Sequence, residues 1–547
     1  MIQENFIKIY EKSFKKNWEL PALTDYSKGT TFSFADVAKE IARIHILFEE
    51  CQIRRGDKIA LIGKDSARWC IVYMAAVTYG AIIVPILQDF SPNDVHHIIN
   101  HSESVFLFVS DRIWDTLEEE MIEDVRGVFS LSDFRCLHQR DGESIQKLLK
   151  GMDEKMAEKY PDGFGKDDIE YAELDNDKVV LLNYTSGTTG FSKGVMLTGN
   201  NLAGNVMYGI ELGVLYRGER ELCFLPLAHA YSCAFNFLVP MAVGAHVYLL
   251  GKVPSPKILL KAFEEVKPNL ILKIYKKMIL PQLSKTTMKV ALNIPLLDSR
   301  IYAQIRKKLV DAFGGRFREV IVGGAAMNEE VTNFLYKIKF PFTIGYGMTE
   351  CGPLISYDHN DEYVPGSCGQ ILKGIMKVRI DSEDPYNKVG EIQVSGENVM
   401  KGYYKNEEAT SKVFTEDGWL RTGDLGTIDA DNRIYIRGRS KTMILGASGQ
   451  NIYPEEIESK LNNLPFVMES IIIEKNGKLV GLVYPDYDTV DSTGISHEDL
   501  PIIMEQNRIE LNKLLAPYEA VSALQLYPTE FEKTPKKSIK RYLYSNY

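Results

Sequence analysis

The sequence predicts an α/β protein, with a large N-terminal domain of α/β sheets, a β-rich subdomain and a small α+β C-terminal domain. Helical and strand patterns alternate from about residue 30 to 130, which is typical of sheets covered by helices. Strand-rich and turn-rich segments begin near residue 365. A short polar crossing at Gly438–Lys441 separates these segments from a further helix and hairpin. We therefore expect one domain at 1–438 and a second at 439–547.

The composition is that of an ordinary globular protein. Its 547 residues are too many for one hydrophobic core, and 45% of them are apolar and 25% charged. The formal net charge of -10 disfavours a nucleic-acid partner, which needs a basic face. The seven cysteines are scattered, so we expect neither a zinc site nor a disulfide framework, and a cytoplasmic location fits best. The opening residues lack a basic-then-apolar pattern, so no secretory signal is expected.

The first alternating segment predicts buried helices and strands. Ser33 caps an amphipathic helix, and continuous apolar runs predict strands at Lys58–Ile62 and Val105–Val109. The uncharged run Trp69–Leu87 is nearly long enough to cross a bilayer. It divides more naturally into a helix ending near Gly80 and a strand after it, so we interpret it as a buried helix–strand unit.

Residues Val179–Gly194 organise the large domain. They open with a short apolar run, typical of a buried strand, and continue as glycines and hydroxyl residues with Lys193 among them. Glycines let backbone N–H groups converge on an anion, while hydroxyls and a lysine add donors that suit a polyphosphate. A flexible linker is the alternative, but the preceding strand and the apolar Val195–Leu197 favour a phosphate loop. It is not the Walker A pattern, because a glycine follows the lysine.

Several strands after the loop run into polar or glycine-rich turns. The segment Glu221–Tyr231 is interpreted as a strand ending at a proline, followed by His229. Val320–Ala326 is a strand that enters a small-residue turn, where a flat ligand can approach the backbone, and Phe342–Glu350 repeats this pattern. The other elements expected here are strands at Val247–Leu250 and Leu270–Leu272 and a helix at Pro256–Val266.

The later part of the chain predicts smaller elements. Strands are expected at Gly390–Val394 and Arg433–Arg437, and Pro454 begins a helix. Asn476-Gly477 marks the turn of a hairpin. Earlier in the chain, residues 139–175 are polar and charged, which we interpret as a surface excursion that leads into the phosphate loop.

Five motifs occur in one order: TSGTTG..KG, GYGMTE, RTGDLG, GRSK and the segment Gly449–Glu458. In this order the chain resembles the acyl-adenylate-forming (AMP-binding) superfamily, and most of all long-chain acyl-CoA synthetases, over nearly its whole length. The resemblance implies that a carboxylate attacks the α-phosphate of ATP to give acyl-adenylate and pyrophosphate, after which a thiol attacks the acyl carbon. It implies ATP, Mg²⁺ and CoA as cofactors, and a small C-terminal domain that swings between two poses.

The resemblance also implies a role for each motif residue. The residues that would hold the β- and γ-phosphates are Thr185, Ser186, Gly187, Thr188, Thr189, Gly190 and Lys193. Tyr346 would stack on adenine, although a tyrosine at this spacing is more often core. The other residues of the adenine site would be Gly323, Gly324, Ala325 and Gly347. Thr349 would bond the α-phosphate, and Glu350 would hold Mg²⁺, a cation that takes carboxylate and phosphate oxygens.

Four further residues receive roles in the same way. Asp424 would accept both ribose hydroxyls, with turn chemistry as the alternative for an aspartate after Thr422-Gly423. Arg439 resembles a second ribose contact, and Lys441 lies close to the family's hinge position. His229 matches a residue near the acyl carboxylate, whereas a lone histidine is otherwise usually structural.

The tail departs from the family pattern. The family places a lysine three residues before an arginine near the C-terminus, and counting back from Arg541 gives Ser538. Lys537 is the nearest substitute for this lysine, which reaches the α-phosphate and the attacking carboxylate. The alternatives are slow adenylation and a solvated basic tail.

We expect a ligase that joins a long-chain fatty acid to CoA, because the neighbours of His229 suit a hydrocarbon tail. These neighbours are Tyr231, Phe235, Phe237 and Leu238. The second hypothesis is transfer to the phosphopantetheine of an acyl carrier protein, or adenylation of an amino or aryl acid. The third is a weak acyl- or nucleotide-binding sensor, motivated by Ser538. We expect no transmembrane segment, and a peripheral membrane contact stays open.

Overall fold

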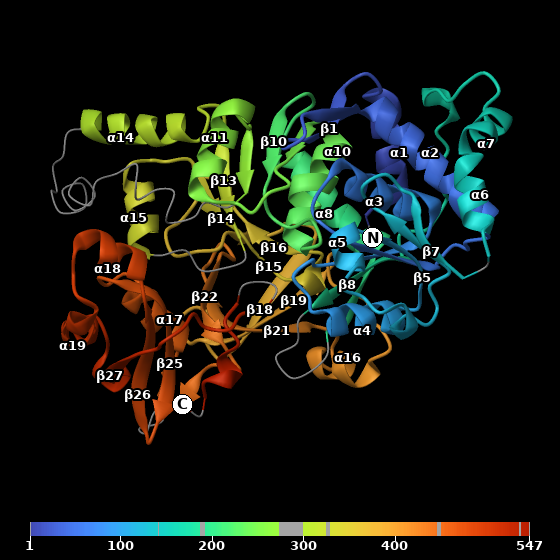
Figure 1. Cartoon of the computed structure of the whole chain (residues 1–547). Helices are drawn as coiled ribbons and strands as arrows, with labels where there is room; N and C mark the ends of the chain where they lie inside the picture. Colours follow the sequence, from blue (N-terminus) through green and yellow to red (C-terminus); the bar gives the residue numbers. More distant parts are fainter. Residues whose placement is uncertain are drawn as a thin grey trace.

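The computed structural model describes the chain except for Met1, Asp141, Asn546 and residues 186–191, 273–298, 324–328, 446–449 and 535–537. Within the described residues, helices cover large sheets, and the predicted α/β class is confirmed (Figure 1). The residues after 439 gather at one end of the molecule, away from the N-terminal elements (Figure 1).

One large sheet contains the strand that leads into the predicted phosphate loop. Its described strands, in spatial order, are β20 (Gly402–Tyr403), β9 (Lys193–Thr198), β8 (Val179–Thr185), β4 (Ile82–Ile86), β3 (Lys58–Ile62), β5 (Ser104–Val109), β6 (Gly127–Ser130) and β7 (Cys136–Gln139). The strands from β8 to β6 are parallel, whereas β9 turns back antiparallel to β8. Strands β3 and β5 are buried on both faces, which explains their continuous apolar runs.

Two helices on this sheet begin and end where the sequence signals them. Helix α2 (Phe34–Glu50) starts at Ser33, whose hydroxyl accepts from Asp36 N at 3.1 Å, while the Asp36 carboxylate accepts from Ser33 N at 2.8 Å. Helix α3 (Ala67–Tyr79) ends at Gly80, whose φ is 90°, and β4 follows. The helix–strand interpretation of this uncharged run is therefore confirmed. Among the helices of the described residues, none has the length and apolarity that crossing a bilayer requires.

The polar stretch 139–175 contains two helices that the sequence analysis did not predict. They are α6 (Ser144–Lys150) and α7 (Met152–Lys159). Three ion pairs join α7 to α2: Arg43–Asp153 at 2.6 Å, Lys159–Glu49 at 2.6 Å and Lys155–Glu50 at 3.2 Å. Exposed pairs of this kind contribute at most about 1 kcal/mol each, so α7 is held to α2 by modest contacts.

The second large sheet lies beside the first, with helices between them. Its described strands, in spatial order, are β14 (Phe342–Ile344), β13 (Glu319–Val322), β12 (Leu270–Leu272), β10 (Arg220–Cys223), β11 (His246–Leu249), β1 (Pro21–Asp25) and β2 (Thr30–Ser33). The helical segments that pack together against it are α1 (Phe6–Lys16), α8 (Gly199–Glu211), α9 (Ala230–Ser232), a π-helical turn (Cys233–Leu238) and α10 (Val239–Val243). His229 stands immediately before α9.

Two smaller sheets complete the part before residue 439. One contains β15 (Tyr346–Gly347), β16 (Leu354–Tyr357) and β17 (Gln370–Ile371), and the other β18 (Met376–Asp381), β19 (Gly390–Gly396), β21 (Leu420–Ile428) and β22 (Ile434–Arg439). The other described helices here are α4 (Pro92–Ser102), α5 (Asp111–Trp114), α11 (Pro256–Val266), α14 (Ser299–Ala312), α15 (Glu329–Lys337) and α16 (Glu407–Val413).

The residues after 439 form their own sheets and helices. They are the strands β23 (Ile444–Leu445), β24 (Asn451–Ile452), β25 (Val467–Lys475), β26 (Lys478–Pro485) and β27 (Val521–Leu526), and the helices α17 (Pro454–Leu461), α18 (Tyr487–Thr493) and α19 (Leu500–Lys513). Asn476 and Gly477 link β25 to β26 with φ of 54° and 72°, as the predicted hairpin turn requires. Two clusters of buried apolar side chains consist only of residues from this part of the chain. The boundary at 438/439 stays a prediction.

Candidate active site

The predicted phosphate loop connects two neighbouring strands of the first large sheet. Strand β8 ends at Thr185 and β9 begins at Lys193, and these two residues are cross-strand partners. The ammonium of Lys193 lies 5.0 Å from the ring centre of Tyr403, which is on the next strand, β20. This distance is typical of a cation–π contact, so the aromatic ring holds the lysine at the mouth of the loop.

Tyr403 connects this lysine to the predicted metal ligand. Its hydroxyl donates to Glu350 Oε1 at 2.9 Å. Burial, reinforced by the charge of Glu350, raises the pKa of the Tyr403 hydroxyl, so that it remains a donor. Lys193, Tyr403 and Glu350 therefore form one continuous series of contacts. Tyr403 was not predicted from the sequence, where its only signal is an aromatic residue after Gly402.

A second series of contacts gathers the predicted nucleoside residues. The Tyr346 hydroxyl donates to Asp424 Oδ2 at 2.7 Å, and Arg439 Nε lies 2.8 Å from Asp424 Oδ1. The ladder of β21 and β22 pairs Asp424 directly with Arg439. Asp424 is only 5% exposed, yet a carboxylate has about four lone-pair positions, so acceptor capacity remains after these two contacts.

Charge interactions link the Lys193–Tyr403–Glu350 contacts to the Tyr346–Asp424–Arg439 contacts. Burial raises the pKa of Asp424, and Arg439 and Tyr346 oppose that rise. Asp424 is the main cause that raises the pKa of Arg439, and Glu350 adds to the same effect. Glu350 and Asp424 thus act on one guanidinium, which places the predicted metal ligand and the predicted ribose ligand in the same electrostatic environment.

The turns around these side chains are tightly packed. A Cβ on Gly347 would collide with the carbonyl oxygen of Pro353, and a Cβ on Gly323 would lie 3.1 Å from the ring of Tyr231. Thr349 begins the 3₁₀ turn Thr349–Cys351 and is buried. Glycine is required at Gly347 for this reason, independently of any ligand.

His229 is joined to the loop through β8. Asn183 is on that strand two residues before Thr185, and its Nδ2 donates to the carbonyl oxygen of Ala228 at 3.2 Å. The His229 side chain is half-buried. The arrangement brings the residue predicted near the acyl carboxylate to the end of the strand that carries the loop.

Other predicted residues are not joined to this network by the contacts described here. Lys441 is exposed on the turn after Arg439, and Ser440 N donates to the carbonyl oxygen of Gly423 at 2.9 Å. Ser538 is exposed in a small hairpin whose Lys533 and Ile539 pair. The predicted residues that lie outside the described part of the chain are Ser186, Gly187, Thr188, Thr189, Gly190, Gly324, Ala325 and Lys537.

The donor set fits a cation that is held partly by substrate. In the described part of the chain no group of three or more His, Cys, Asp or Glu side chains is placed to hold a metal ion by itself. Mg²⁺ is commonly bound through one or two carboxylates together with substrate phosphates. The half-buried carboxylate of Glu350, beside Lys193 and Tyr403, meets that requirement.

The AMP-binding enzyme family matches residues 10–404. The long-chain-fatty-acid–CoA ligase 1 of Saccharomyces cerevisiae is 25% identical over 556 residues, which cover 92% of this chain and 79% of the yeast protein. The 4-coumarate–CoA ligase CCL1 of Humulus lupulus is 29% identical over 498 residues, which cover 88% of this chain and 84% of that ligase.

A solved structure has the same fold. ATP-bound MatB from Rhodopseudomonas palustris superposes with a TM-score of 0.76 at 21% identity, and the match covers 99% of both chains. At this identity the likeness concerns the fold alone, whereas the family match covers more than half of the sequence. The chain therefore belongs to the AMP-binding enzyme family.

Proposed function

We propose that this protein activates a long-chain fatty acid with ATP and transfers the acyl group to CoA, with release of pyrophosphate and AMP. The observation that carries this proposal is the pair of contact series around Glu350 and Asp424. Lys193, Tyr403 and Glu350 provide a cation, a hydroxyl and a carboxylate for the triphosphate end. Tyr346, Asp424 and Arg439 provide an aromatic ring and paired charges for the nucleoside end.

In this proposal Lys193 and the loop residues bind the β- and γ-phosphates, and Thr349 binds the α-phosphate. Glu350 and phosphate oxygens would hold Mg²⁺, which supplies charge neutralisation on the phosphates when it is bound. Tyr403 keeps the carboxylate of Glu350 oriented through its hydrogen bond. Asp424 accepts from the ribose hydroxyls, and Lys537 approaches the α-phosphate from the tail. Because Ser538 stands where the family has its lysine, Lys537 is the residue of this set that experiment must examine first.

The acid is proposed to be a long-chain fatty acid because the helical turn after His229 is apolar. Phe235, Phe237 and Leu238 are 4%, 0% and 1% exposed on the π-helical turn, which contacts α8 and continues into α10. Aromatic and aliphatic walls suit a hydrocarbon chain. The yeast relative is named for long-chain fatty acids, which agrees with this proposal.

An aryl acid is the second candidate, and one buried group favours it. Glu221 is 0% exposed, and its Oε2 has no hydrogen-bond partner among the described residues, while Oε1 accepts from Asn236 Nδ2 at 2.6 Å. Glu221 also helps to raise the pKa of Tyr231, the neighbour of Gly323, after burial itself. A buried carboxyl oxygen without a hydrogen-bond partner suits a substrate acid that carries a hydroxyl donor at the end far from its own carboxylate. The relative from Humulus lupulus is named for 4-coumarate.

The test is acid-dependent exchange of pyrophosphate into ATP, with palmitate, decanoate and 4-coumarate offered separately. We expect exchange with palmitate to exceed that with 4-coumarate, and mass spectrometry to detect acyl-CoA only when CoA is present. If exchange were faster with 4-coumarate, the proposed substrate would be an aryl acid and not a fatty acid. If product formed only with an acyl carrier protein that bears phosphopantetheine, that carrier protein would replace CoA as the proposed acceptor of the acyl group. If pure, folded protein gave no acid-dependent exchange, the sensor hypothesis would be favoured.

A further inference from the structure

A cavity in the N-terminal part of the chain lies outside the residues assigned to ATP and the acid. Its volume is about 610 Å³, within the range of roughly 300–1,000 Å³ that is usual for small-molecule sites. Helices α2 and α3 form one side, the end of β5 and the loop before β7 form another, and α6 and the start of α7 close it. None of its lining residues belongs to the two contact series of the candidate active site.

The floor of the cavity is apolar. Ile44 and Leu47 of α2, Ile71 of α3 and Phe108 of β5 line it, and all four are less than 5% exposed overall. Phe134 adds an aromatic wall, with its ring centre 6.1 Å from that of Phe108. Such a surface favours the apolar part of a ligand, because contact with it removes both surfaces from water.

The charges around this floor are mainly positive, although the whole protein carries a formal charge of -10. The charged lining residues are Arg43, Arg68, Arg135 and Lys150 on the basic side and Glu40 and Asp133 on the acidic side. Within the described residues neither Arg68 nor Lys150 has an ion pair, and the Arg68 guanidinium lies 5.7 Å from the ring centre of Phe134. Arg43 pairs with Asp153, whose side chain is 87% exposed.

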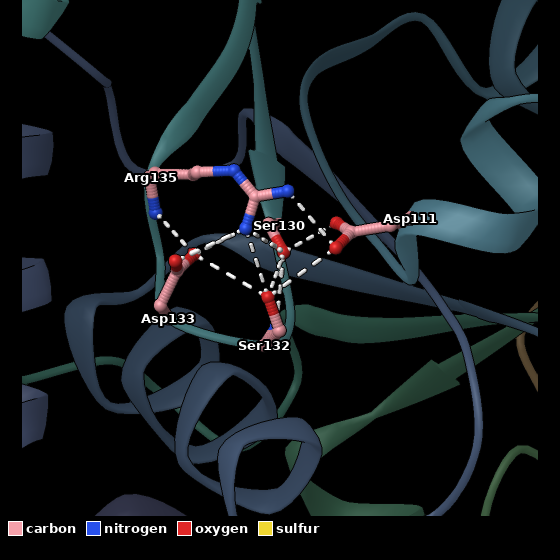
Figure 2. Close-up of polar contacts among 5 residues, drawn as sticks. All are labelled: Asp111, Ser130, Ser132, Asp133 and Arg135. Atoms are coloured by element: carbon pink, nitrogen blue, oxygen red, sulfur yellow. Dashed lines mark hydrogen bonds and ion pairs between the residues drawn. The ribbon is translucent and has the colours of Figure 1, made fainter.

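Figure 2 shows that one guanidinium, that of Arg135, contacts the carboxylates of both Asp111 and Asp133 beside the cavity. Arg135 extends to Asp111 at 2.9 Å and to Asp133 at 3.0 Å, and Ser130 donates to Asp111 at 2.6 Å. This network fixes the turn that holds Phe134 at a φ of 63°, an uncommon conformation for a bulky residue. Among the charged lining residues without an ion pair in the described part of the chain, the two cations Arg68 and Lys150 outnumber the one carboxylate, Glu40.

We propose that this cavity is a second binding site, for an amphiphilic organic anion whose apolar body lies against the floor and whose anionic group meets Arg68 and Lys150. A carboxylate and a phosphate ester share the chemistry that these two cations recognise. The proposal does not depend on which acid the active site takes, because the site is defined by its own lining residues.

The test uses decanoate that carries a photoreactive diazirine at the end of its chain, applied to the full chain without ATP, Mg²⁺ or CoA. Labelled peptides are identified by mass spectrometry. We expect saturable labelling of peptides from α2, α3 and residues 131–136. Unlabelled decanoate or decyl phosphate should suppress it, and their ranking identifies the preferred head group. Decanol should compete roughly tenfold less well, because it lacks the charge that Arg68 and Lys150 recognise.

Two variants and one control make this test specific. Arg68→Gln should lower labelling of these peptides roughly tenfold by removing the unpaired cation, and Leu149→Trp should lower it by filling the cavity. Arg54→Gln removes an exposed arginine that does not line the cavity and should change nothing. Thermal unfolding verifies that each variant is folded. Labels absent from these peptides, labels unaffected by both variants, or equal competition by decanol would each overturn the proposal.

Discussion

At the scale of single residues, Tyr403 connects Lys193 to Glu350. It contacts Lys193 through its ring and Glu350 through its hydroxyl, so one side chain orients both a cation and a carboxylate. Its neighbour Tyr404, directly after the strand, instead donates to Glu103 Oε2 at 2.8 Å. The adjacent tyrosines provide a natural pair of variants.

Tyr403→Phe is expected to raise the Mg²⁺ concentration needed for half-maximal pyrophosphate exchange and to lower exchange about tenfold. The variant removes a hydrogen bond to a charged group, worth about 1.5–3 kcal/mol, while it keeps the ring over Lys193. Tyr404→Phe is the matched control and should leave both quantities unchanged. If the two variants behaved alike, Tyr403 would have no special part in holding Glu350.

Glu221 predicts a pH dependence of stability. Burial raises its pKa well above the ordinary value, so the folded protein keeps the proton over a pH range in which the unfolded chain has lost it. The contribution is fully present below the unfolded pKa of about 4.3 and is lost as the pH rises through the folded pKa. Glu221→Gln should therefore flatten the fall of the melting temperature between pH 5 and pH 8. An unchanged slope would show that Glu221 is not protonated in the fold.

The residues of the site were predictable to different degrees. Asp424 and Arg439 came from the resemblance, and the structure places them as direct cross-strand partners. Tyr403 was not predictable, because its contacts with Lys193 and Glu350 arise from chain segments far apart in sequence. Glu221 follows the exposed Arg220 at the start of a short strand, so its sequence neighbours give no sign that its carboxyl is buried, and no local pattern identifies Asn236 as its partner.

At the scale of elements, helices and strands with strong local signals were predicted well. Ser33, Gly80 and Asn476-Gly477 each determine the end or turn of an element through a local interaction. Helices α6 and α7 were missed because their sequences are mostly polar, with Ile145, Met152 and Met156 as the buried residues. These two helices close the proposed second site, so the local patterns gave no indication of it.

The last segment of the chain is attached to α17 by a largely buried ion pair. Arg541 donates from Nη1 to Glu458 Oε1 at 2.7 Å, and the two side chains are 27% and 8% exposed. Glu458 also accepts from Ile472 N at 2.7 Å. Burial raises the pKa of Glu458 to about 7, although Arg541 opposes the rise. The pair therefore links the tail, the helix and β25.

Arg541→Ala should destabilise the C-terminal part of the chain by about 3 kcal/mol, because it leaves a buried carboxyl without its cation. The loss should be larger at pH 8 than at pH 6, since loss of Arg541 raises the pKa of Glu458 further and protonation relieves the buried charge more completely at the lower pH. Unfolding in urea at the two pH values measures both effects. Lys513→Ala, which breaks an exposed pair on α19, is the control and should cost less than about 1 kcal/mol.

At the scale of the whole molecule, we propose that the chain divides at 438/439 into a large unit and a small one. The buried apolar clusters after this point contain residues of the small unit alone. We expect brief trypsin treatment to cut first after Arg439 or Lys441, and N-terminal sequencing of the fragments to locate the cut. A first cut between residues 365 and 390 would instead make the β-rich subdomain the independent unit.

If the small unit takes one pose for adenylation and another for thioester formation, a tail residue should affect only one of these two half-reactions. Lys537→Ala should lower pyrophosphate exchange about 100-fold, as expected for a group that contacts the reacting phosphate, and leave thioester formation from supplied acyl-adenylate nearly unchanged. Lys540→Ala serves as the comparison, because Lys540 pairs with Glu532 at 3.2 Å. Equal damage to both half-reactions would remove Lys537 from its proposed role.

Arg439 is the last residue of β22, and Asp424 is its partner on the adjacent strand. Arg439 is the first residue of the proposed small unit, yet it belongs to the same antiparallel ladder as Asp424, upstream of the turn at Ser440. A rotation about the backbone after that turn would move the tail away from the site and bring another surface of the small unit to it. This ladder would stay undisturbed. The adenylate would stay seated between the two steps, and only the groups that face its reactive carbonyl would change.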